Sequence, residues 1–402
     1  MSRAARQAVT AVAVVVLVVA ALVLVRAVRS GDDVTSTPAD PTTTAADGTS
    51  AAQYFLDTYV DADGRVVRRD QGDDTVSEGQ AYAMLVAVGS DDEDTFDAVW
   101  SWTQAHLLRS QDGLLSWHWS GGEVVDASSA SDADLDAARA LVLAGQKWGD
   151  DSLTRAGVDL GTAILDHETV STPAGLVLVA GQWATSSSPY WFNPSYVSPA
   201  AMQVLYAASG DSRWTSLEAG SNAAVRAATV DGQLTPDWAT IDDQGNASPS
   251  ASPSGAAAVF SYDAARTLVR NAESCSSDDT AITAALAAIL GTSGEAYGTY
   301  SLDAQPQTSD LSALTAVAQA AGAAVTGDDA TAEAKLAEAR SIVAQGSTYY
   351  GAAWAALGSI MLTTDALGGC PPLADDASSS ATTSPTPTPT ESATASVSSA
   401  DA

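Results

Sequence analysis

The sequence is poor in basic residues, in cysteine and in histidine. Its 402 residues include 17 lysines and arginines, of which only Lys147 and Lys335 are lysines, against 49 acidic residues, and the net charge is −32. Because a chain this acidic is repelled by a phosphate backbone, we expect no nucleic-acid partner, and phosphorylated metabolites are poor candidates for a substrate. Neutral or cationic polysaccharides are better candidates. Because 46% of the residues are hydrophobic, the chain can still bury a large core.

Motifs for metals and cofactors are missing as well. The three histidines, His106, His118 and His167, have no partner at i, i+4 spacing, and there is no Cys-x-x-Cys pair, so no structural zinc site is expected. Glycine-rich phosphate loops and the Gly-x-Ser-x-Gly turn of esterases are also absent. We therefore expect no metal and no organic cofactor, and the chemistry that remains is that of carboxylates.

Cys275 and Cys370 are the only cysteines. In an exported protein, two cysteines with none left over most simply form one disulfide. It would close a loop of about 95 residues and stabilise the fold by roughly 4 kcal/mol on the chain-entropy model. Two free buried thiols are the alternative.

Both ends of the chain differ in composition from its middle. Val9 to Val25 form an apolar run of 17 residues with arginines on both sides, which as a helix at about 1.5 Å per residue nearly matches the hydrocarbon core of a bilayer. We interpret residues 1–29 as a membrane anchor that holds the protein outside the cytoplasm, or as a signal segment whose cleavage gives a secreted protein. Residues 30–50 are predicted to be a disordered linker, and residues 374–402 a disordered Ser/Thr/Pro-rich tail.

The middle of the chain, residues 51–373, is predicted to be one all-α domain, because its apolar residues follow a helical period throughout. The expected helices are twelve: 51–60, 77–90, 93–110, 131–148, 151–167, 198–210, 213–229, 262–272, 278–291, 309–322, 330–344 and 347–363. Helix starts are indicated by Ser77, Ser131, Ser198 and Asp278. Such alanine-rich helices favour pairs packed in a closed toroid or in an open solenoid.

Much of the aromatic content falls between the expected helices. Trp and Tyr rings stack on the apolar faces of sugar rings, and loops on a rigid scaffold are common sites of function. Each single aromatic residue is more simply a core filler or a loop anchor, and only their concentration in loops indicates a sugar site. The residues concerned are Trp117, Trp119, Trp183, Tyr190, Trp191, Tyr196, Trp238, Tyr297 and Tyr300.

Four segments carry the carboxylates and their neighbours: Thr75–Gln80, Ala130–Asp136, Trp191–Tyr196 and Phe260–Arg266. Three of them place an acidic residue at or beside a predicted helix start. In these segments, and in the Ala-Ser-Asp-Ala-Asp and Tyr-Asp-Ala-x-Arg motifs within them, the chain resembles glycoside hydrolase family 8 over about residues 51–365. This resemblance to a family of endoglucanases and chitosanases implies an (α/α)6 barrel.

The resemblance also implies roles for individual residues. Glu78 matches the general acid, Asp263 the base that activates water, and Asp132 the aspartate that holds the sugar ring at the cleavage point. These roles imply inversion, for which the two working carboxyls stand roughly 6.5 to 9.5 Å apart. Residues expected to contact the substrate are Tyr262, Arg266, Trp117, Tyr196 and Asp134.

The residues themselves allow a structural interpretation beside the catalytic one. A helix N-terminus favours a charged carboxylate, which suits Asp263 and Asp132 but opposes Glu78, which must keep its proton. Burial and the charge of Asp132 would have to outweigh the helix dipole there. On the structural interpretation, Glu78 is a helix-start residue, Asp132 and Asp134 are an N-cap pair, and Asp263 with Arg266 is a surface ion pair.

We therefore predict an endo-acting glycoside hydrolase that cleaves β-1,4-glucan, such as cellulose or mixed-linkage glucan, by inversion and as a monomer. Chitosan and xylan are alternative substrates within the same family. Two other classes remain as alternatives: a non-catalytic glycan-binding surface protein, against which the intact carboxylates argue, and a solenoid scaffold, which leaves the order of the motifs unexplained.

Overall fold

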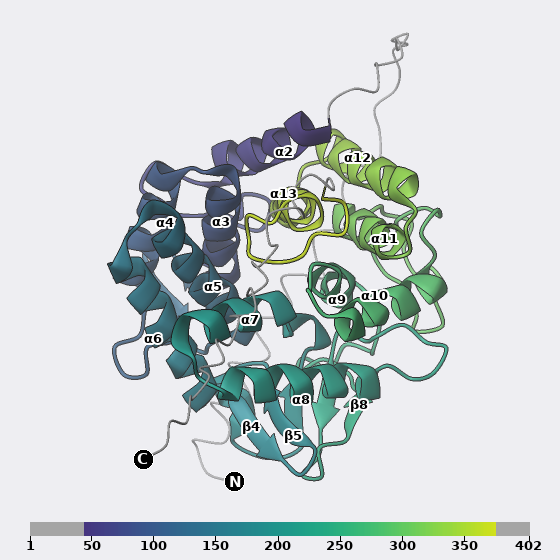
Figure 1. Ribbon diagram of the computed structural model, residues 1–402, viewed down its shortest axis with the longest axis horizontal. Helices are drawn as coiled ribbons and strands as arrows, with labels where there is room; N and C mark the ends of the chain where they lie inside the picture. Colours follow the sequence, from purple (N-terminus) through teal and green to yellow (C-terminus); the bar gives the residue numbers. More distant parts are fainter. Residues whose placement is uncertain (1–43, 375–402) are drawn as a thin grey trace, which may run out of the picture.

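The structure, a computed structural model, describes residues 44–374, and within them it contains twelve α-helices arranged in a ring (Figure 1). In chain order the helices are α2 (Thr44–Tyr59), α3 (Ser77–Ser90), α4 (Glu93–His106), α5 (Ser131–Trp148), α6 (Asp151–His167), α7 (Pro199–Ser209), α8 (Arg213–Ala228), α9 (Ala264–Ala272), α10 (Ser277–Leu290), α11 (Ala313–Val325), α12 (Asp329–Gln345) and α13 (Tyr349–Thr363).

Six of these helices form an inner ring and the other six surround it. Each inner helix, in the order α3, α5, α7, α9, α11 and α13, contacts the next, and α13 contacts α3, so the ring is closed. The inner helices are buried along most of their length, as an apolar or alanine-rich helix on all sides should be. This closure confirms the predicted (α/α)6 barrel and excludes the open solenoid.

Small residues allow the inner helices to approach one another closely. At Gly358 of α13, a side-chain Cβ would stand 2.1 Å from the side chain of Val317 in α11. Only glycine fits at this contact, and the small side chain of alanine allows a close approach elsewhere on these helices.

The expected helices are all present, and three of them, 77–90, 131–148 and 151–167, have the predicted bounds. The clearest difference is at α2, which begins at Thr44, so the last seven residues of the expected linker are helical. The helix expected over 309–322 begins at Ala313 instead, because Ser312 caps it by accepting the Thr315 N–H.

Two of the expected N-caps are displaced by one residue. Ser77 and Ser131 are the first residues of their helices, and the N-cap positions belong to Val76 and Ala130. The Ser131 hydroxyl donates instead to the Val179 carbonyl, 2.6 Å away. A tertiary partner has therefore replaced the local cap that the sequence indicated.

The connections of the barrel differ greatly between its two ends. Each inner helix from α3 to α11 is joined to the outer helix that follows it by a short turn, such as 91–92 or 149–150. The connections that lead into the inner helices α5, α7 and α9 are long, spanning 107–130, 168–198 and 229–263. The irregular part of the molecule therefore lies at the N-terminal ends of the inner helices α5, α7 and α9.

Short antiparallel strands, which the sequence did not predict, stiffen these long connections. They form three small sheets, ordered β1-β2-β3, β4-β5 and β6-β7-β8. Strands of two to four residues are too short to show an alternating pattern in the sequence. Their bounds are β1 (Thr75–Val76), β2 (His118–Ser120), β3 (Glu123–Asp126), β4 (Thr169–Thr172), β5 (Gly175–Leu178), β6 (Tyr190–Phe192), β7 (Ala239–Ile241) and β8 (Ala247–Pro249).

The interior of the barrel contains buried ion pairs between α5 and the α9 segment. Arg270 is paired with Asp136 through two hydrogen bonds of 2.7 and 2.6 Å. Arg139 is paired in the same bidentate way with Glu273, both bonds being 2.8 Å. Because all four side chains are buried, each pair depends on its geometry, and removal of one partner would leave an uncompensated charge.

The predicted disulfide between Cys275 and Cys370 is confirmed and joins the turn after α9 to the segment after α13. None of the helices within 44–374 is long and apolar enough to cross a bilayer. The anchor predicted around Val9–Val25 and the tail from residue 375 onward lie outside the described residues.

Candidate active site

The three carboxylates that the sequence analysis singled out meet at one arginine. Arg266, fully buried in α9, donates from Nη1 to Asp132 Oδ2 at 2.7 Å and to Glu78 Oε2 at 3.2 Å. Its Nη2 donates to Asp263 Oδ1 at 2.7 Å. Asp263 and Arg266 are thus a pair at i, i+3, but the arginine is buried, so the interpretation as a surface pair is wrong.

Glu78 lies in the first turn of α3 with 22% of its side chain exposed. Tyr349 of α13 donates its hydroxyl to Glu78 Oε1 at 3.2 Å. Burial raises the pKa of Glu78 to about 7; the charge of Arg266 opposes this rise, and those of Asp132 and Asp263 add to it. Desolvation therefore outweighs the opposing charge of Arg266, as a proton donor at this position requires.

Asp263 immediately precedes α9 and has 30% of its side chain exposed. Both of its oxygens are held, Oδ1 by Arg266 and Oδ2 by the Asn193 amide at 3.1 Å. Since the terminal nitrogens of one guanidinium are about 2.3 Å apart, the bound oxygens of Glu78 and Asp263 are no more than about 8 Å apart. The spacing of an inverting pair, roughly 6.5 to 9.5 Å, overlaps this limit.

Asp237 fixes the backbone on both sides of Asp263. Its Oδ1 accepts the N–H groups of Ser261 and Ala264, each at 2.8 Å, and its Oδ2 accepts the Ser261 hydroxyl. Burial, followed by the neighbouring charge of Asp263, raises the pKa of Asp237 to about 7. The sequence analysis gave no role to Asp237 or Asn193, because nothing local indicates that either side chain reaches the segment before α9.

Asp132 is the second residue of α5, in its first turn, and its side chain is 3% exposed. Burial raises its pKa, whereas the charges of Arg266 and Arg270 lower it. It shares the Nη1 donor of Arg266 with Glu78, which places the two carboxyls side by side. The structure therefore supports its predicted place beside the acid, and its role in holding a sugar ring stays a prediction.

Asp134 was expected to contact the substrate, and the structure contradicts this prediction. Its side chain is fully buried and accepts the Leu115 N–H at 2.8 Å. Two residues along an α-helix turn a side chain by about 200°, so Asp134 points away from the face that carries Asp132. It is also not an N-cap, because it lies inside the first turn of α5.

The other predicted contact residues do lie around the carboxylates. Tyr196 is stacked over the guanidinium of Arg266, 5.2 Å from the ring centroid. Tyr262 is 48% exposed directly beside Asp263. Trp117 is half-buried, and its carbonyl accepts the Ser77 N–H, so it lies next to the start of the helix that carries Glu78.

Further tyrosines at the site were missed in the sequence. Besides Tyr349, these are Tyr82, whose hydroxyl accepts from Arg266 Nη1 at 3.0 Å, and Tyr350, whose hydroxyl donates to the Tyr262 carbonyl at 2.8 Å. They lie on α3 and α13, whose apolar composition indicated a role in the core only. The pair Tyr349-Tyr350 at a predicted helix start was the one available signal.

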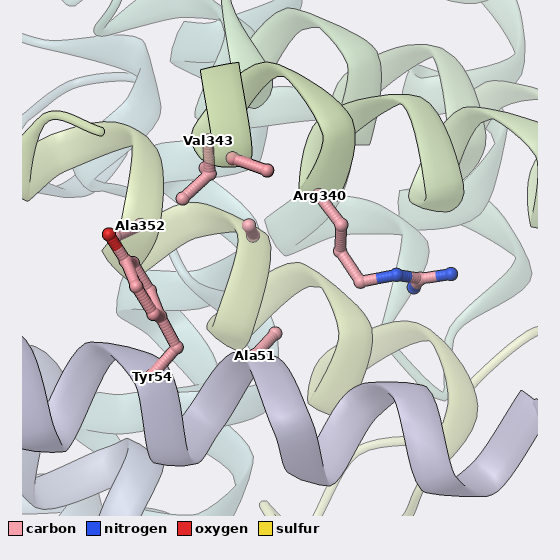
Figure 2. A pocket seen from close by; sticks show the side chains of 7 residues that line it. Ala51, Tyr54, Arg340, Val343 and Ala352 are labelled. Atoms are coloured by element: carbon pink, nitrogen blue, oxygen red, sulfur yellow. The ribbon is translucent and has the colours of Figure 1, made fainter. Parts of the chain in front are cut away.

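A pocket of about 160 Å³ lies elsewhere, between α2, α12 and α13 (Figure 2). Its lining is mostly aliphatic and contains none of the carboxylates bound to Arg266, so it is not a candidate for the chemistry. The lining residues are Ala51, Tyr54, Arg340, Val343, Ala344, Ala352 and Ala355.

A closed ring of six inner helices with six outer helices around it defines the (α/α)6 class of barrels, and the carboxylates bound to Arg266 give this barrel a candidate active site. Comparison with known families agrees: residues 39–364 match the family model described as glycosyl hydrolases family 8. The chain belongs to this family.

Curated relatives match over part of the chain. An endoglucanase of Escherichia coli strain K12 is 33% identical over 198 residues, which cover 47% of this chain and 53% of the relative. An endoglucanase of Xanthomonas axonopodis pv. citri strain 306 is 33% identical over 223 residues, covering 53% and 56%. The chain thus spans about half the length of the curated relatives it matches.

Solved structures match over most of the described domain. An endo-β-1,4-glucanase of Acetobacter xylinum has a TM-score of 0.67 at 23% identity, with 78% of this chain and 97% of that chain covered. A β-1,3-1,4-glucanase of Paenibacillus sp. X4 has a TM-score of 0.69 at 20% identity, with 80% and 93% covered. At these identities the likeness shows the shared fold.

Proposed function

We propose that this protein is an endo-acting glycoside hydrolase that cleaves β-1,4-glucan, cellulose or mixed-linkage glucan, by inversion. The observation that carries the proposal is the arrangement at Arg266. One buried guanidinium holds Glu78, Asp132 and Asp263 together, while Glu78 and Asp263 both remain partly exposed. Family membership and the names of the endoglucanase relatives support the β-glucan substrate.

In the proposed reaction Glu78 is the acid and Asp263 the base. Because the pKa of Glu78 is raised to about 7, the group is mostly protonated in mildly acidic solution and can donate to the glycosidic oxygen as the C1–O bond breaks. Asp263 accepts a proton from a water molecule whose oxygen attacks C1 from the opposite face. After one turnover Glu78 is ionised and Asp263 protonated, and exchange with solvent restores both.

The charged and aromatic neighbours give these two groups their orientation. Asn193 and Arg266 hold the two oxygens of Asp263, and Asp237 fixes the backbone around it. Tyr262 and Tyr196 offer ring faces to the sugars on either side of the carboxylates. The protein would then supply positioned proton transfer and stacking, with a water molecule as the second reactant.

The test is an assay of the full-length protein on carboxymethyl cellulose, barley β-glucan, xylan and chitosan, with reducing ends counted. Glu78→Gln and Asp263→Asn are compared with Glu333→Gln and Asp97→Asn, which change exposed acidic residues of α12 and α4. We expect cleavage of the β-glucans, loss of activity in the first two variants and full activity in the controls. Cleavage of chitosan or xylan alone would replace the substrate, and binding without cleavage would favour a glycan-binding protein.

Inversion has its own measurement. Proton NMR of a digest of cello-oligosaccharides in its first minutes distinguishes the anomers, and an inverting enzyme releases the α-anomer from a β-glucan. An initial excess of the β-anomer would show retention and would require a nucleophile in place of the water-activating base.

We also propose that the protein acts outside the cytoplasm as a monomer, tethered by residues 1–29 or secreted after their cleavage. The disulfide Cys275–Cys370 supports an oxidising compartment. Cell fractionation followed by protease treatment of intact cells tests the location, and light scattering of detergent-solubilised protein tests the monomer. Intact chain recovered only from the cytoplasm would contradict the proposal.

A further inference from the structure

A second pair of buried carboxyls lies apart from Arg266. Asp134 belongs to α5 and Glu168 directly follows α6, and both side chains are fully buried. The two carboxyls lie close enough for a hydrogen bond between them if one carries a proton. Asp134 Oδ1 accepts the Leu115 N–H at 2.8 Å, and Glu168 Oε1 accepts the Ser129 hydroxyl at 2.6 Å.

The remaining oxygens of the pair receive no hydrogen bond from an N–H or hydroxyl group. Asp134 Oδ2 and Glu168 Oε2 are both buried, so the opposite carboxyl is the one group that could share a proton with them. Ionised carboxylates only accept hydrogen bonds, so a bond between two of them requires that one carry a proton. If both carboxyls were ionised, the two buried negative charges would repel each other strongly. Each unpaired oxygen would also have lost its hydration without gaining a hydrogen bond.

The charged groups facing the pair do not change this conclusion. The nearest cation is Arg109, but its guanidinium is occupied by Asp112, at 2.9 Å through Nε, and by the Ala127 carbonyl. Asp132 adds a further negative charge. Burial, the largest cause, raises the pKa of Glu168 to about 8 and that of Asp134 well above its usual range.

We propose that Asp134 and Glu168 hold one proton between them at neutral pH, and that this shared-proton pair is a positioning element for the catalytic carboxylates. The proposal deepens the proposed function and rests on it for the catalytic consequence, whereas the shared proton stands without it.

The hydrogen bonds that the pair accepts from Leu115 and Ser129 connect it to the segments that carry Glu78 and Asp132. Leu115, held by Asp134, is two residues before Trp117, whose carbonyl binds the Ser77 N–H at the start of the helix that carries Glu78. On the other side, Ser129, held by Glu168, is three residues before Asp132 in the connection that leads into α5.

The same serine also binds a second part of the connection 168–198, in which Glu168 lies. The Ser129 hydroxyl accepts the Gln182 N–H at 3.0 Å, and its carbonyl accepts the Trp183 indole N–H at 3.2 Å. The pair therefore lies where two of the long connections, 107–130 and 168–198, meet. Loss of the shared proton would loosen both at once.

The proton is tested in the Glu78→Gln protein, which lacks the acid of the active site. Infrared spectra at pH 7.5 are compared between this protein and versions that also carry Glu168→Gln, Asp134→Asn or both. In each single change an amide N–H can take the place of the shared proton, so the partner carboxyl ionises. We expect either change to remove the same carboxylic-acid C=O band, and the double change to remove no more.

Two outcomes of this experiment overturn the shared proton. One is a spectrum that either single change leaves untouched, which would mean that both carboxyls are already ionised. The other is two separate bands that are lost additively, which would mean two protons. If one variant does not fold, the remaining single variant and the pH titration of the band in Glu78→Gln still decide.

The positioning role has a separate readout. We expect Glu168→Ala to lower kcat on carboxymethyl cellulose at pH 6 tenfold or more with a smaller change in KM, and Glu168→Gln to restore kcat to within threefold. We also expect the decrease in Tm between pH 7 and 9.5 to be smaller in Glu168→Gln than in the parent. An alanine variant as active as the parent would refute the positioning role, while a protein inactive in every form would refute the proposed function and leave the infrared result standing.

Discussion

The hydroxyl of Tyr349 should control the pH range in which the protein is active. It donates to Glu78 Oε1 at 3.2 Å, and a donor stabilises the ionised form of a carboxyl more than the protonated form. A hydrogen bond of this kind contributes about 1 kcal/mol net. Because one pKa unit corresponds to about 1.4 kcal/mol, the change Tyr349→Phe should raise the pKa of Glu78 by roughly 0.7 unit.

The sign of the effect on activity follows from the role of the acid. Glu78 must be protonated to donate, so kcat/KM is high below its pKa, which is about 7, and falls above it. Tyr349→Phe should therefore move the alkaline limb of the kcat/KM profile to higher pH by roughly 0.7 unit. Initial rates on carboxymethyl cellulose between pH 4 and 10 measure this shift.

Tyr59→Phe is the matched control. Its ring lies 6.0 Å from that of Tyr349, and its hydroxyl is bonded to Ser347 instead of Glu78. The control removes the same atom from the same neighbourhood and should leave the alkaline limb in place. A downward shift in Tyr349→Phe would mean that the tyrosine accepts from the protonated acid, and an equal shift in both variants would refute the direct contact.

Three further predictions concern positioning and stability. Asp237→Ala should lower kcat tenfold or more with little change in KM, because the backbone around Asp263 loses the three hydrogen bonds that Asp237 accepts. Steady-state kinetics, with circular dichroism as a check on folding, measure this, and a tenfold rise in KM would argue against it. Glu78 and Glu168 have pKa values raised above those of the unfolded chain. Their contribution to stability is therefore complete below about pH 4.5 and is lost as the pH rises through about 7 for Glu78 and about 8 for Glu168. Urea unfolding at pH 5, 7 and 9 should show that the unfolding free energy of Glu168→Gln changes less with pH than that of the parent. Arg270→Met should destabilise the fold by about 3 to 5 kcal/mol, because it leaves the buried charge of Asp136 without a partner. Adding Asp136→Leu should recover much of that loss. If the losses of the two single variants simply added in the double variant, this account would be wrong.

Sequence periodicity predicted the helices well where their ends carry local signals, whereas the closed ring was implied by the resemblance to the family. The helices 131–148 and 151–167 are separated by Gly149, which takes the left-handed conformation with a φ of 75°, and Asp150, whose side chain caps the next helix. These signals depend on neighbours in sequence alone. Where a distant partner decides, as Val179 does for Ser131, the prediction of the cap was wrong.

The candidate site was predicted in its carboxylates but not in their surroundings. Glu78 and Asp263 were found from the motifs of the family, yet nothing in their own segments shows that Arg266 joins them or that Tyr349 reaches the acid. Asp134 was misplaced because its motif indicates a polar cluster without saying which face of the helix each member occupies. Contacts between residues far apart in sequence depend on helix rotation and packing, which periodicity does not fix.

The unequal ends of the barrel separate stability from specificity. The turns 91–92 and 149–150 hold the helix pairs together, whereas the connections 107–130, 168–198 and 229–263 surround the carboxylates. Insertions, grafts or randomised libraries in those three connections can therefore reshape the sugar-contacting surface while the ring of helices stays intact. The exception is the stretch around Ser129 and Gln182, where a change for specificity would also disturb the support of the catalytic groups.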